Sequence, residues 1–232
     1  LATIFLIREI RKLKQGNVKV VNKETTTNTE RKLSKHVVIT IAREYASGGR
    51  YIGKLVADKL GIKLYDNEFI SKVAEETGLS EEYIENNEQK RDVLASLNNG
   101  YYSGLNNSDE LFIKESELIK EVADKESCVI VGRCADFILS GRENVINVFV
   151  YSDMEDKINR ATTYYGMDKS KAEKEIKRID KLRANHYKYY TEKEWNNHSN
   201  YDICINSDAF GVEKSADLIC ELVESKLEMV KA

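Results

Sequence analysis

The chain contains VVITIAREYASGGRYIGKLVADKL at residues 37–60, where an apolar β-branched run enters a loop with Ser47, Gly48, Gly49 and Arg50, and then a segment of helical spacing. A strand that leads into a glycine loop and a helix N-terminus builds an anion site. Successive backbone N–H groups point into one concavity there, and the helix dipole adds partial positive charge. Because phosphate is a common ligand of such sites, the pattern predicts an enzyme that handles a nucleotide.

Composition narrows the class of protein. The chain has 232 residues, 41% of them hydrophobic and 32% charged, with a net charge of −3. These values are typical of one globular domain, and the acidic balance argues against a nucleic-acid partner. The four cysteines and three histidines show no metal-ligand spacing, so we expect no protein metal site and interpret the cysteines as buried free thiols of a reducing cytosol. No apolar run approaches the ~18 residues of a membrane span, which favours a cytoplasmic protein without a membrane partner.

Residues 1–35 differ from the rest of the chain. LATIFLIREIRKLKQG has an apolar beginning with early charges, and NKETTTNTERKLSK is polar throughout. We interpret this segment as an N-terminal extension and linker that need not be ordered, and a docking helix is the alternative. The main domain is then expected to cover residues 36–232.

The remainder alternates between two patterns. Short apolar runs predict five strands, at 37–41, 62–65, 128–131, 146–150 and 202–205. Helical spacing is found at 50–60, 67–77, 80–97, 110–124, 134–140, 153–165, 169–188 and 211–228. Strands that alternate with helices predict a doubly wound α/β fold with a parallel sheet. Two long helical excursions, at 67–125 and 153–200, are expected to cover the ligand crevice at the carboxyl ends of the strands.

The glycine loop matches the phosphate-loop pattern GxxxxGK[ST] only in part. Gly48, Gly53 and Lys54 fit the pattern literally, but no Ser or Thr follows them. We prefer a register in which residues 46–49 form the cradle and Arg50 opens the helix. Arg50 then supplies the cation that a lysine normally provides, and Lys54 lies one turn further on. A glycine turn without a ligand is the alternative.

A second segment, CVIVGRCADFIL at 128–139, places Arg133 directly after a predicted strand that ends at Gly132. Ligands bind at the carboxyl ends of such strands, and the planar guanidinium of arginine matches phosphate oxygens. Asp136 can pair with Arg133 or reach a metal shell. The segment therefore predicts substrate binding by Arg133 and Asp136, with a structural Arg–Asp pair as the alternative.

The third segment, KRIDKLRANHYKYY at 177–190, has Asp180 and Arg183 on one face of a helix. A helix that supplies cations to a phosphoryl group in transfer is a common solution, because the charge of that group is spread over several oxygens. Arg160, in the preceding helical segment, is a further candidate for this role. A solvated charged helix is the alternative.

Together the three segments resemble the cytidylate-kinase-like family of P-loop nucleoside monophosphate (NMP) kinases over residues 36–228. ITIAREYASGGRYIGKLVADKLGIKLYD is similar to the family's opening strand, RExxSGGR loop, helix and second strand. VIVGRCADFIL is similar to its GRxxDxIL segment, and RIDKLRANHYKYY to its D-x-x-R lid helix. The resemblance implies a three-layer P-loop kinase sandwich with a five-stranded parallel sheet, an NMP-binding region around 67–125 and a lid around 155–200.

The resemblance also implies an activity, namely transfer of the γ-phosphoryl group of ATP, with Mg²⁺, to a nucleoside monophosphate such as CMP or dCMP. It implies that the donor phosphates are cradled by Ser47, Gly48, Gly49 and Arg50. It places Asp66 and Arg133 on the acceptor side. Arg160, Asp180 and Arg183 would come from the lid region, where the arginines bridge the donor and acceptor phosphates and the aspartate orients the acceptor or an arginine. Nucleotides are the expected partners, and a homo-oligomer is left open.

This chain departs from the pattern of cytidylate kinases at three positions. Gly49 replaces the lysine of the phosphate loop, Tyr51 replaces its magnesium-binding Thr or Ser, and Val131 replaces an Asp. The phosphate cation and the metal ligands are therefore unconventional. Two alternatives stay open: a non-catalytic nucleotide-binding sensor of the same fold, and a kinase of a non-nucleotide small molecule.

Overall fold

A computed structural model describes residues 36–66 and 107–231. The expected N-terminal extension and the helices expected at 67–77 and 80–97 lie outside these residues. In chain order the elements are β1 (Val38–Arg43), α2 (Gly49–Leu60), β2 (Lys63–Tyr65), α5 (Asn107–Lys125), β3 (Cys128–Val131), α6 (Ala135–Ile138), β4 (Val145–Tyr151), α7 (Met154–Tyr164), α8 (Lys169–Thr191), a 3₁₀ turn (His198–Asn200), β5 (Ile203–Asn206) and α9 (Ser207–Lys231), the last interrupted at Gly211.

The five predicted strands form one parallel sheet in the order β2-β3-β1-β4-β5. Strand β1 lies at its centre, with Val38 opposite Cys128 of β3 and Val145 of β4. The strand continues beyond its predicted end because its pairing with β4 extends to Arg43, opposite Val150. Arg43 is therefore held by the sheet at the edge where the phosphate loop begins.

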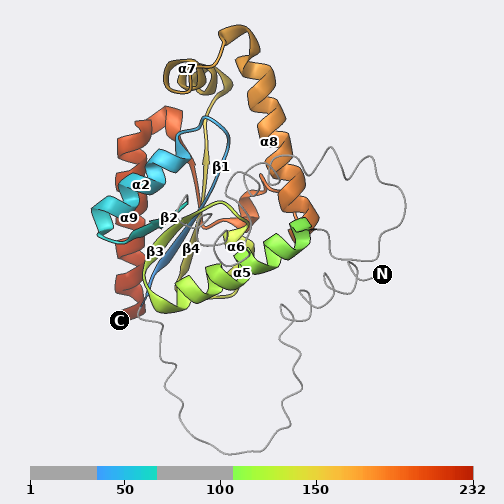
Figure 1. Ribbon diagram of the computed structural model, residues 1–232. Helices are drawn as coiled ribbons and strands as arrows, with labels where there is room; N and C mark the ends of the chain where they lie inside the picture. The colour runs from blue at the N-terminus through green and yellow to red at the C-terminus, as the bar shows by residue number, and fades with distance from the viewer. Residues whose placement is uncertain (1–35, 67–106, 232) are drawn as a thin grey trace, which may run out of the picture.

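Different helices cover the two faces of the sheet (Figure 1). Ile39 and Ile41 of β1 pack with α2 and α9, whereas Val38 packs with α5 and α6 on the opposite face. Alternate residues of a strand point to opposite faces, so burial on both sides explains why the run in β1 is apolar throughout. The arrangement is a helix–sheet–helix sandwich, which confirms the predicted fold class.

Helices α7 and α8 extend from the carboxyl-terminal edge of the sheet, where the loop between β1 and α2 also lies (Figure 1). The C-terminal part of α8 packs against α5, where the rings of Tyr190 and Phe112 stack with centroids 3.7 Å apart. Ala161 of α7 and Ile176 of α8 pack with Ala46 of the loop. Both helices are thus anchored around the site that the loop begins to form.

Three of the four cysteines (Cys128, Cys134 and Cys220) are buried and free, as predicted. Cys204 is free but exposed, because it lies on β5 at the edge of the sheet. None of the helices in the described part of the chain combines the length and apolar character that crossing a membrane requires.

Candidate active site

The loop between β1 and α2 has the shape of an anion cradle. Ala46 and Gly48 adopt left-handed conformations, with φ of 58° and 78°, and α2 begins directly afterwards at Gly49. No hydrogen bond occupies the N–H groups of residues 48–51 within the described parts of the chain, as expected for the first turn of a helix. These free donors and the positive end of the α2 dipole make the loop suitable for a phosphate.

Ser47 contributes to this loop through its backbone, because its side chain is fully buried. The hydroxyl donates to the carbonyl oxygens of Glu44 at 2.9 Å and Val150 at 3.3 Å. Ser207, at the start of α9, donates its own hydroxyl to the Ser47 carbonyl at 2.6 Å. The serine predicted for the cradle therefore fixes the shape of the loop and turns its side chain away from the anion site.

Arg160 of α7 reaches the loop at Gly48. A Cβ atom at Gly48 would lie 3.3 Å from Cζ of Arg160 and 2.8 Å from Cγ1 of Val212, so the close approach requires a glycine. Arg160 also lies 3.7 Å from a carboxylate oxygen of Asp156, but its Nε is buried without a hydrogen-bond partner in the described structure. The structure thus places the Arg160 guanidinium beside the glycine loop, and its role toward a phosphoryl group stays a prediction.

Arg50 lies in the first turn of α2, and its side chain is 59% exposed. Its Nε pairs with the carboxylate of Asp66, which follows β2. The structure therefore joins two predicted site residues, one assigned to the donor side and one to the acceptor side. Lys54, one turn further along α2, is exposed.

Gly53 distinguishes the two registers of the phosphate-loop pattern. It lies inside α2, where an added Cβ would be 3.1 Å from both Ile41 Cδ1 and Val131 Cγ2. The glycine is therefore explained by close packing of α2 on the sheet. In the literal GxxxxGK register, residues 50–53 would lie in the phosphate cradle, although they belong to α2. The preferred register, with the cradle at residues 46–49, agrees with a helix that begins at Gly49.

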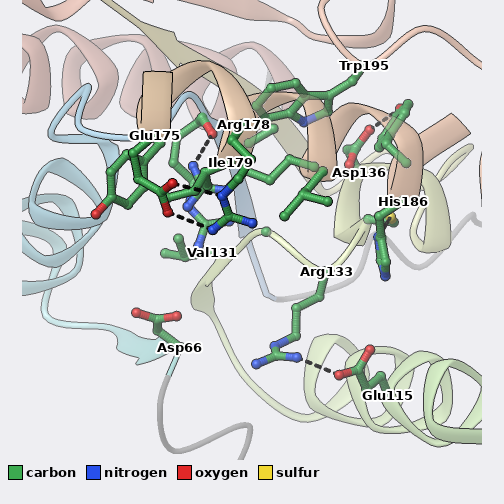
Figure 2. Close-up of a pocket in the computed structure, with 18 residues that line it drawn as sticks. Asp66, Glu115, Val131, Arg133, Asp136, Glu175, Arg178, Ile179, His186 and Trp195 are labelled. Carbon is green, nitrogen blue, oxygen red and sulfur yellow. Dashed lines mark hydrogen bonds and ion pairs between the residues drawn. The ribbon is translucent and has the colours of Figure 1, made fainter. Parts of the chain in front are cut away.

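A cavity of about 460 Å³ opens beside the loop, between α8 and the ends of β1 and β3 (Figure 2). Its wall contains four arginines, namely Arg43, Arg133, Arg178 and Arg183. The acidic residues in the wall are Asp66, Glu115, Asp136 and Glu175. A cavity of this size accommodates a small molecule. Arg133 and Arg178 pair with Glu115 and Glu175, whereas Arg43 and Arg183 have no ion-pair partner within the described residues, which favours an anionic ligand.

An unusual backbone conformation sets the direction of the Arg133 side chain. Gly132, Arg133 and Cys134 are all left-handed, with φ of 80°, 58° and 54°, and such strain in side-chain-bearing residues is typical of functional sites. The Arg133 Nη1 pairs with Glu115 Oε1 of α5 at 2.5 Å, and both side chains are buried (Figure 2). The carboxylate that pairs with Arg133 thus comes from α5, the helix directly before β3, and not from Asp136.

Asp136, in α6, is buried and accepts a hydrogen bond of 2.6 Å from the Tyr187 hydroxyl. Burial raises the pKa of Asp136, and the hydrogen bond from Tyr187 opposes this effect. The contact joins α6 to α8 across the back of the cavity. Asp136 therefore lines the predicted substrate site while it also holds the lid helix in place.

Arg183 reaches from α8 to the end of β1. Its Nη1 donates to the Arg43 carbonyl at 3.0 Å, and its guanidinium carbon lies 5.5 Å from the centre of the Tyr45 ring. Burial lowers the pKa of Arg183, and the charge of Arg43 lowers it further. Two guanidinium groups are thus held close together at the entrance to the phosphate loop, an arrangement that an anion would stabilise.

Asp180 is not among the residues that line the cavity. Its carboxylate accepts from the Tyr45 backbone N–H at 2.6 Å and from Lys157 Nζ at 3.3 Å. Burial raises the pKa of Asp180, and these two donors lower it. Lys157 also donates to Glu44 at 2.9 Å. Asp180 therefore connects the lid to the phosphate loop, and its predicted role in orienting a substrate stays a prediction.

The sequence reasoning missed Arg43, Glu44, Lys157 and Glu115 as members of the site. Arg43 and Glu44 lie within the quoted RExxSGGR loop, after the strand predicted at 37–41, and the sequence analysis assigns no role to either. Lys157 and Glu115 lie in amphipathic helices, where charged residues are normally solvated. Burial of such a charge depends on tertiary contacts, so neither residue gives a signal in the local pattern.

Residues 36–66 and 107–231 contain no group of three His, Cys, Asp or Glu residues that could hold a metal ion. At the position of the expected magnesium-binding hydroxyl, Tyr51 is 48% exposed. Position 51 therefore offers no serine or threonine hydroxyl to a magnesium ion. Magnesium that is bound mainly by substrate phosphates and water is compatible with this position.

Comparison with known proteins assigns this site to a family. The model of the cytidylate kinase-like family matches residues 38–209. The chain belongs to this family. A cytidylate kinase of Archaeoglobus fulgidus is 25% identical over 191 residues, which cover 81% of this chain and 95% of that protein.

Solved structures agree on the fold. An uncharacterized protein from Eubacterium ventriosum ATCC 27560 is 29% identical, with a TM-score of 0.64, and the match covers 82% of this chain and 99% of that one. Shikimate kinase from Acinetobacter baumannii, solved with shikimate, is 15% identical with a TM-score of 0.51 over 83% of this chain and 95% of that one. Family and fold together support a phosphotransferase, a kinase of a nucleotide or another small molecule.

Proposed function

We propose that this member of the cytidylate kinase-like family transfers the γ-phosphoryl group of ATP to a nucleoside monophosphate, with CMP and dCMP as the first candidates. One observation carries the proposal: an anion cradle and a cavity walled by four arginines meet at the end of β1. Two phosphate-bearing ligands can therefore face each other there. The named activity of the relative from Archaeoglobus fulgidus supports cytidylate as the acceptor.

In the proposed reaction, the protein positions the two substrates and provides positive charge near the transferred phosphoryl group. The acceptor phosphate, itself anionic at neutral pH, attacks the γ-phosphorus in line and needs no general base. Charge in the transition state is spread over the equatorial oxygens, which arginine side chains can stabilise. Arg160 would act from the donor side, beside Gly48, and Arg183 from the side of β1. Magnesium would supply further charge neutralisation on the phosphates of ATP.

The proposal includes the domain assignments. Residues 36–232 form the kinase domain, with α7 and α8 in the lid of residues 155–200 and α5 in the NMP-binding region of residues 67–125. Support comes from α7 and α8, which carry Arg160 and Arg183 to the loop and the cavity. The cytoplasmic location, the lack of a nucleic-acid partner and the oligomeric state stay predictions from the sequence.

The assignment is tested by measuring ADP release from ATP and Mg²⁺ with a panel of acceptors. We expect CMP or dCMP to raise ADP release well above the rate without acceptor, with the matching diphosphate as the second product. Nucleotide binding in calorimetry without turnover would support the sensor instead. Turnover with a non-nucleotide acceptor alone would support a different small-molecule kinase.

Replacing Arg133 with methionine is expected to raise the KM for the acceptor about tenfold or more and to leave the KM for ATP nearly unchanged. The expected size corresponds to the loss of charge-assisted hydrogen bonds to a phosphate. Steady-state kinetics with each substrate varied in turn provide the measurement.

Two further variants make this test specific. Arg133→Met combined with Glu115→Gln separates the loss of the phosphate ligand from the effect of leaving a buried carboxylate unpaired. Arg142→Met removes an arginine that pairs with Asp124 outside the cavity, so its kinetics should match those of the wild type. An equal rise in both KM values, or no rise in either, would contradict the acceptor-side role of Arg133.

A further inference from the structure

This chain differs from the phosphate-loop pattern GxxxxGK, called the fingerprint below, at two positions where a glycine and a cationic residue have changed places. When the second glycine of GxxxxGK is placed on Gly48, the first glycine falls on residue 43 and the lysine on residue 49. This chain has Arg43 where the fingerprint has glycine, and Gly49 where it has lysine. One cationic side chain is lost from the helix N-terminus and another is gained at the end of β1.

The structure explains why the two changes occur together. A Cβ atom at Gly49 would lie 2.5 Å from Cβ and 3.1 Å from Cγ of Arg43, and 3.1 Å from Cβ of Val150. Non-bonded carbon atoms do not approach to 2.5 Å without displacement of one of them. The stem of Arg43 therefore occupies the space into which a side chain at residue 49 would extend.

The guanidinium of Arg43 continues across the site to Gly132. A Cβ atom there would lie 2.0 Å from Nη1 of Arg43 and 3.1 Å from Cζ, so a side chain at this position would displace the guanidinium from its present path. The side chain thus runs along the floor of the site from the phosphate loop to the loop after β3. It lines the same cavity as Arg133 and Arg183.

Among residues 36–66 and 107–231, this guanidinium has no direct partner for its charge. Within the described residues it makes no hydrogen bond and no ion pair, although its backbone carbonyl accepts from Arg183. Burial lowers the pKa of Arg43, the charge of Asp66 raises it, and the charge of Arg50 lowers it. An ionised group that is removed from water without a partner costs free energy, which an anionic ligand would recover.

We propose that Arg43 binds the transferable phosphate in place of the phosphate-loop lysine, from the end of β1, and that Gly49 is glycine to make room for it. This inference rests on the proposed phosphoryl transfer and deepens it, because it names Arg43, in place of Arg50, as the cation that replaces the phosphate-loop lysine. Arg50 is less suited to this role, since it is 59% exposed and already pairs with Asp66.

The first test measures binding of inorganic tripolyphosphate and of ATP to the full chain by calorimetry, together with thermal unfolding. Arg43→Met keeps the length of the stem and removes the charge, so affinity for both ligands should fall about ten- to hundredfold. Arg43→Lys should stay within about tenfold of the wild type. Without ligand, Arg43→Met should be at least as stable as the wild type, because it removes an unpaired charge. Arg142→Met, with its arginine outside the cavity, is the matched control.

The second test uses the reciprocal exchange. Gly49→Lys alone should lower both stability and affinity, because its stem collides with Arg43. Combined with Arg43→Gly it restores the fingerprint, so the double variant should bind tripolyphosphate more tightly than either single variant. Additive losses in this double-mutant cycle would contradict the shared space.

The outcomes separate the two proposals. If the wild type binds and transfers phosphoryl groups but Arg43→Met binds both ligands within about threefold of it, the role of Arg43 is overturned and the kinase assignment survives. A loss of stability in Arg43→Met without ligand would show a structural role and also overturn the inference. If the wild type neither binds these ligands nor releases ADP with any acceptor, the proposed function itself fails.

Discussion

Replacing Arg183 with methionine is expected to lower kcat at least about a hundredfold, which is the scale of losing one positioned stabiliser of transition-state charge. Its guanidinium lies against the Arg43 carbonyl and the Tyr45 ring, at the junction of the phosphate loop and the cavity. We expect Arg183 to contact the phosphoryl oxygens more strongly in the transition state than in the ground state, so kcat and kcat/KM should fall together. Methionine retains much of the buried stem and limits the loss of packing.

The measurement is steady-state ADP release at saturating ATP and acceptor, with the free energy of unfolding determined in parallel. Lys177→Met is the matched control, because Lys177 lies on the same helix but is 63% exposed and pairs with Glu173. We expect this control to retain the activity of the wild type. A kcat of Arg183→Met within about tenfold of the wild type would remove Arg183 from the mechanism.

For the described residues, the fold could be predicted almost completely from the sequence, because the patterns that indicate its strands and helices are local. The five short apolar runs form the five strands, and the helical pattern predicted at 169–188 lies in α8. A parallel sheet buried on both faces makes such runs continuous, and the alternation of strands with helices then limits the topology. The phosphate loop was recognisable for the same reason, since its glycines and the following helix are adjacent in sequence.

The site was harder to predict because its charges are paired across long sequence separations. The spacing of Asp180 and Arg183 correctly suggested one helix face, but their partners, Tyr45, Lys157 and Arg43, belong to other elements. Helical periodicity gives the direction of a side chain relative to its own helix and contains no information about its neighbours. The contacts of these residues therefore became visible only in the folded chain.

The sequence analysis did not predict a role for Arg43, although the sequence contained a pattern that pointed to one. An arginine at the first glycine position of the phosphate-loop pattern, combined with glycine at the lysine position, is a correlated pair of departures. Each departure alone resembles a weak match to the pattern. Considered together, they indicate a cation that has moved to a different element, and the distances at Gly49 and Gly132 support this explanation.

One buried cation, Lys157 of α7, links α7 and α8 to the start of the glycine loop. Its side chain is 6% exposed and donates to Glu44 at 2.9 Å and to Asp180 at 3.3 Å. Asp180 in turn accepts from the Tyr45 N–H, and the Ser152 N–H donates to Glu44 at 3.3 Å. The position of the loop backbone at residues 44 and 45 therefore depends on a charge that no local pattern distinguishes from a solvated lysine.

Lys157→Met is accordingly expected to lower the free energy of unfolding by about 3 kcal/mol at pH 7, because it leaves two partly buried carboxylates without their shared cation. Lys157 lowers the pKa of Asp180 against the effect of burial, so its removal raises that pKa further. A carboxyl whose pKa is higher in the folded than in the unfolded state loses stability as the pH rises through the folded value. The deficit should therefore be larger at pH 7 than at pH 5, as measured by denaturant unfolding at both values.

Two further variants identify the cause of the loss of stability in Lys157→Met. Adding Asp180→Asn to Lys157→Met removes one of the unpaired charges while an amide oxygen can still accept from the Tyr45 N–H, so part of the lost stability should return. Lys177→Met, which breaks an exposed pair on α8, should change stability by less than about 1 kcal/mol. A deficit of equal size at both pH values, with no recovery in the double variant, would mean that Lys157 acts through packing alone. The loop would then owe its position to the hydrogen bonds of Ser47 and Ser207, and the cation would have no part in joining lid to phosphate site.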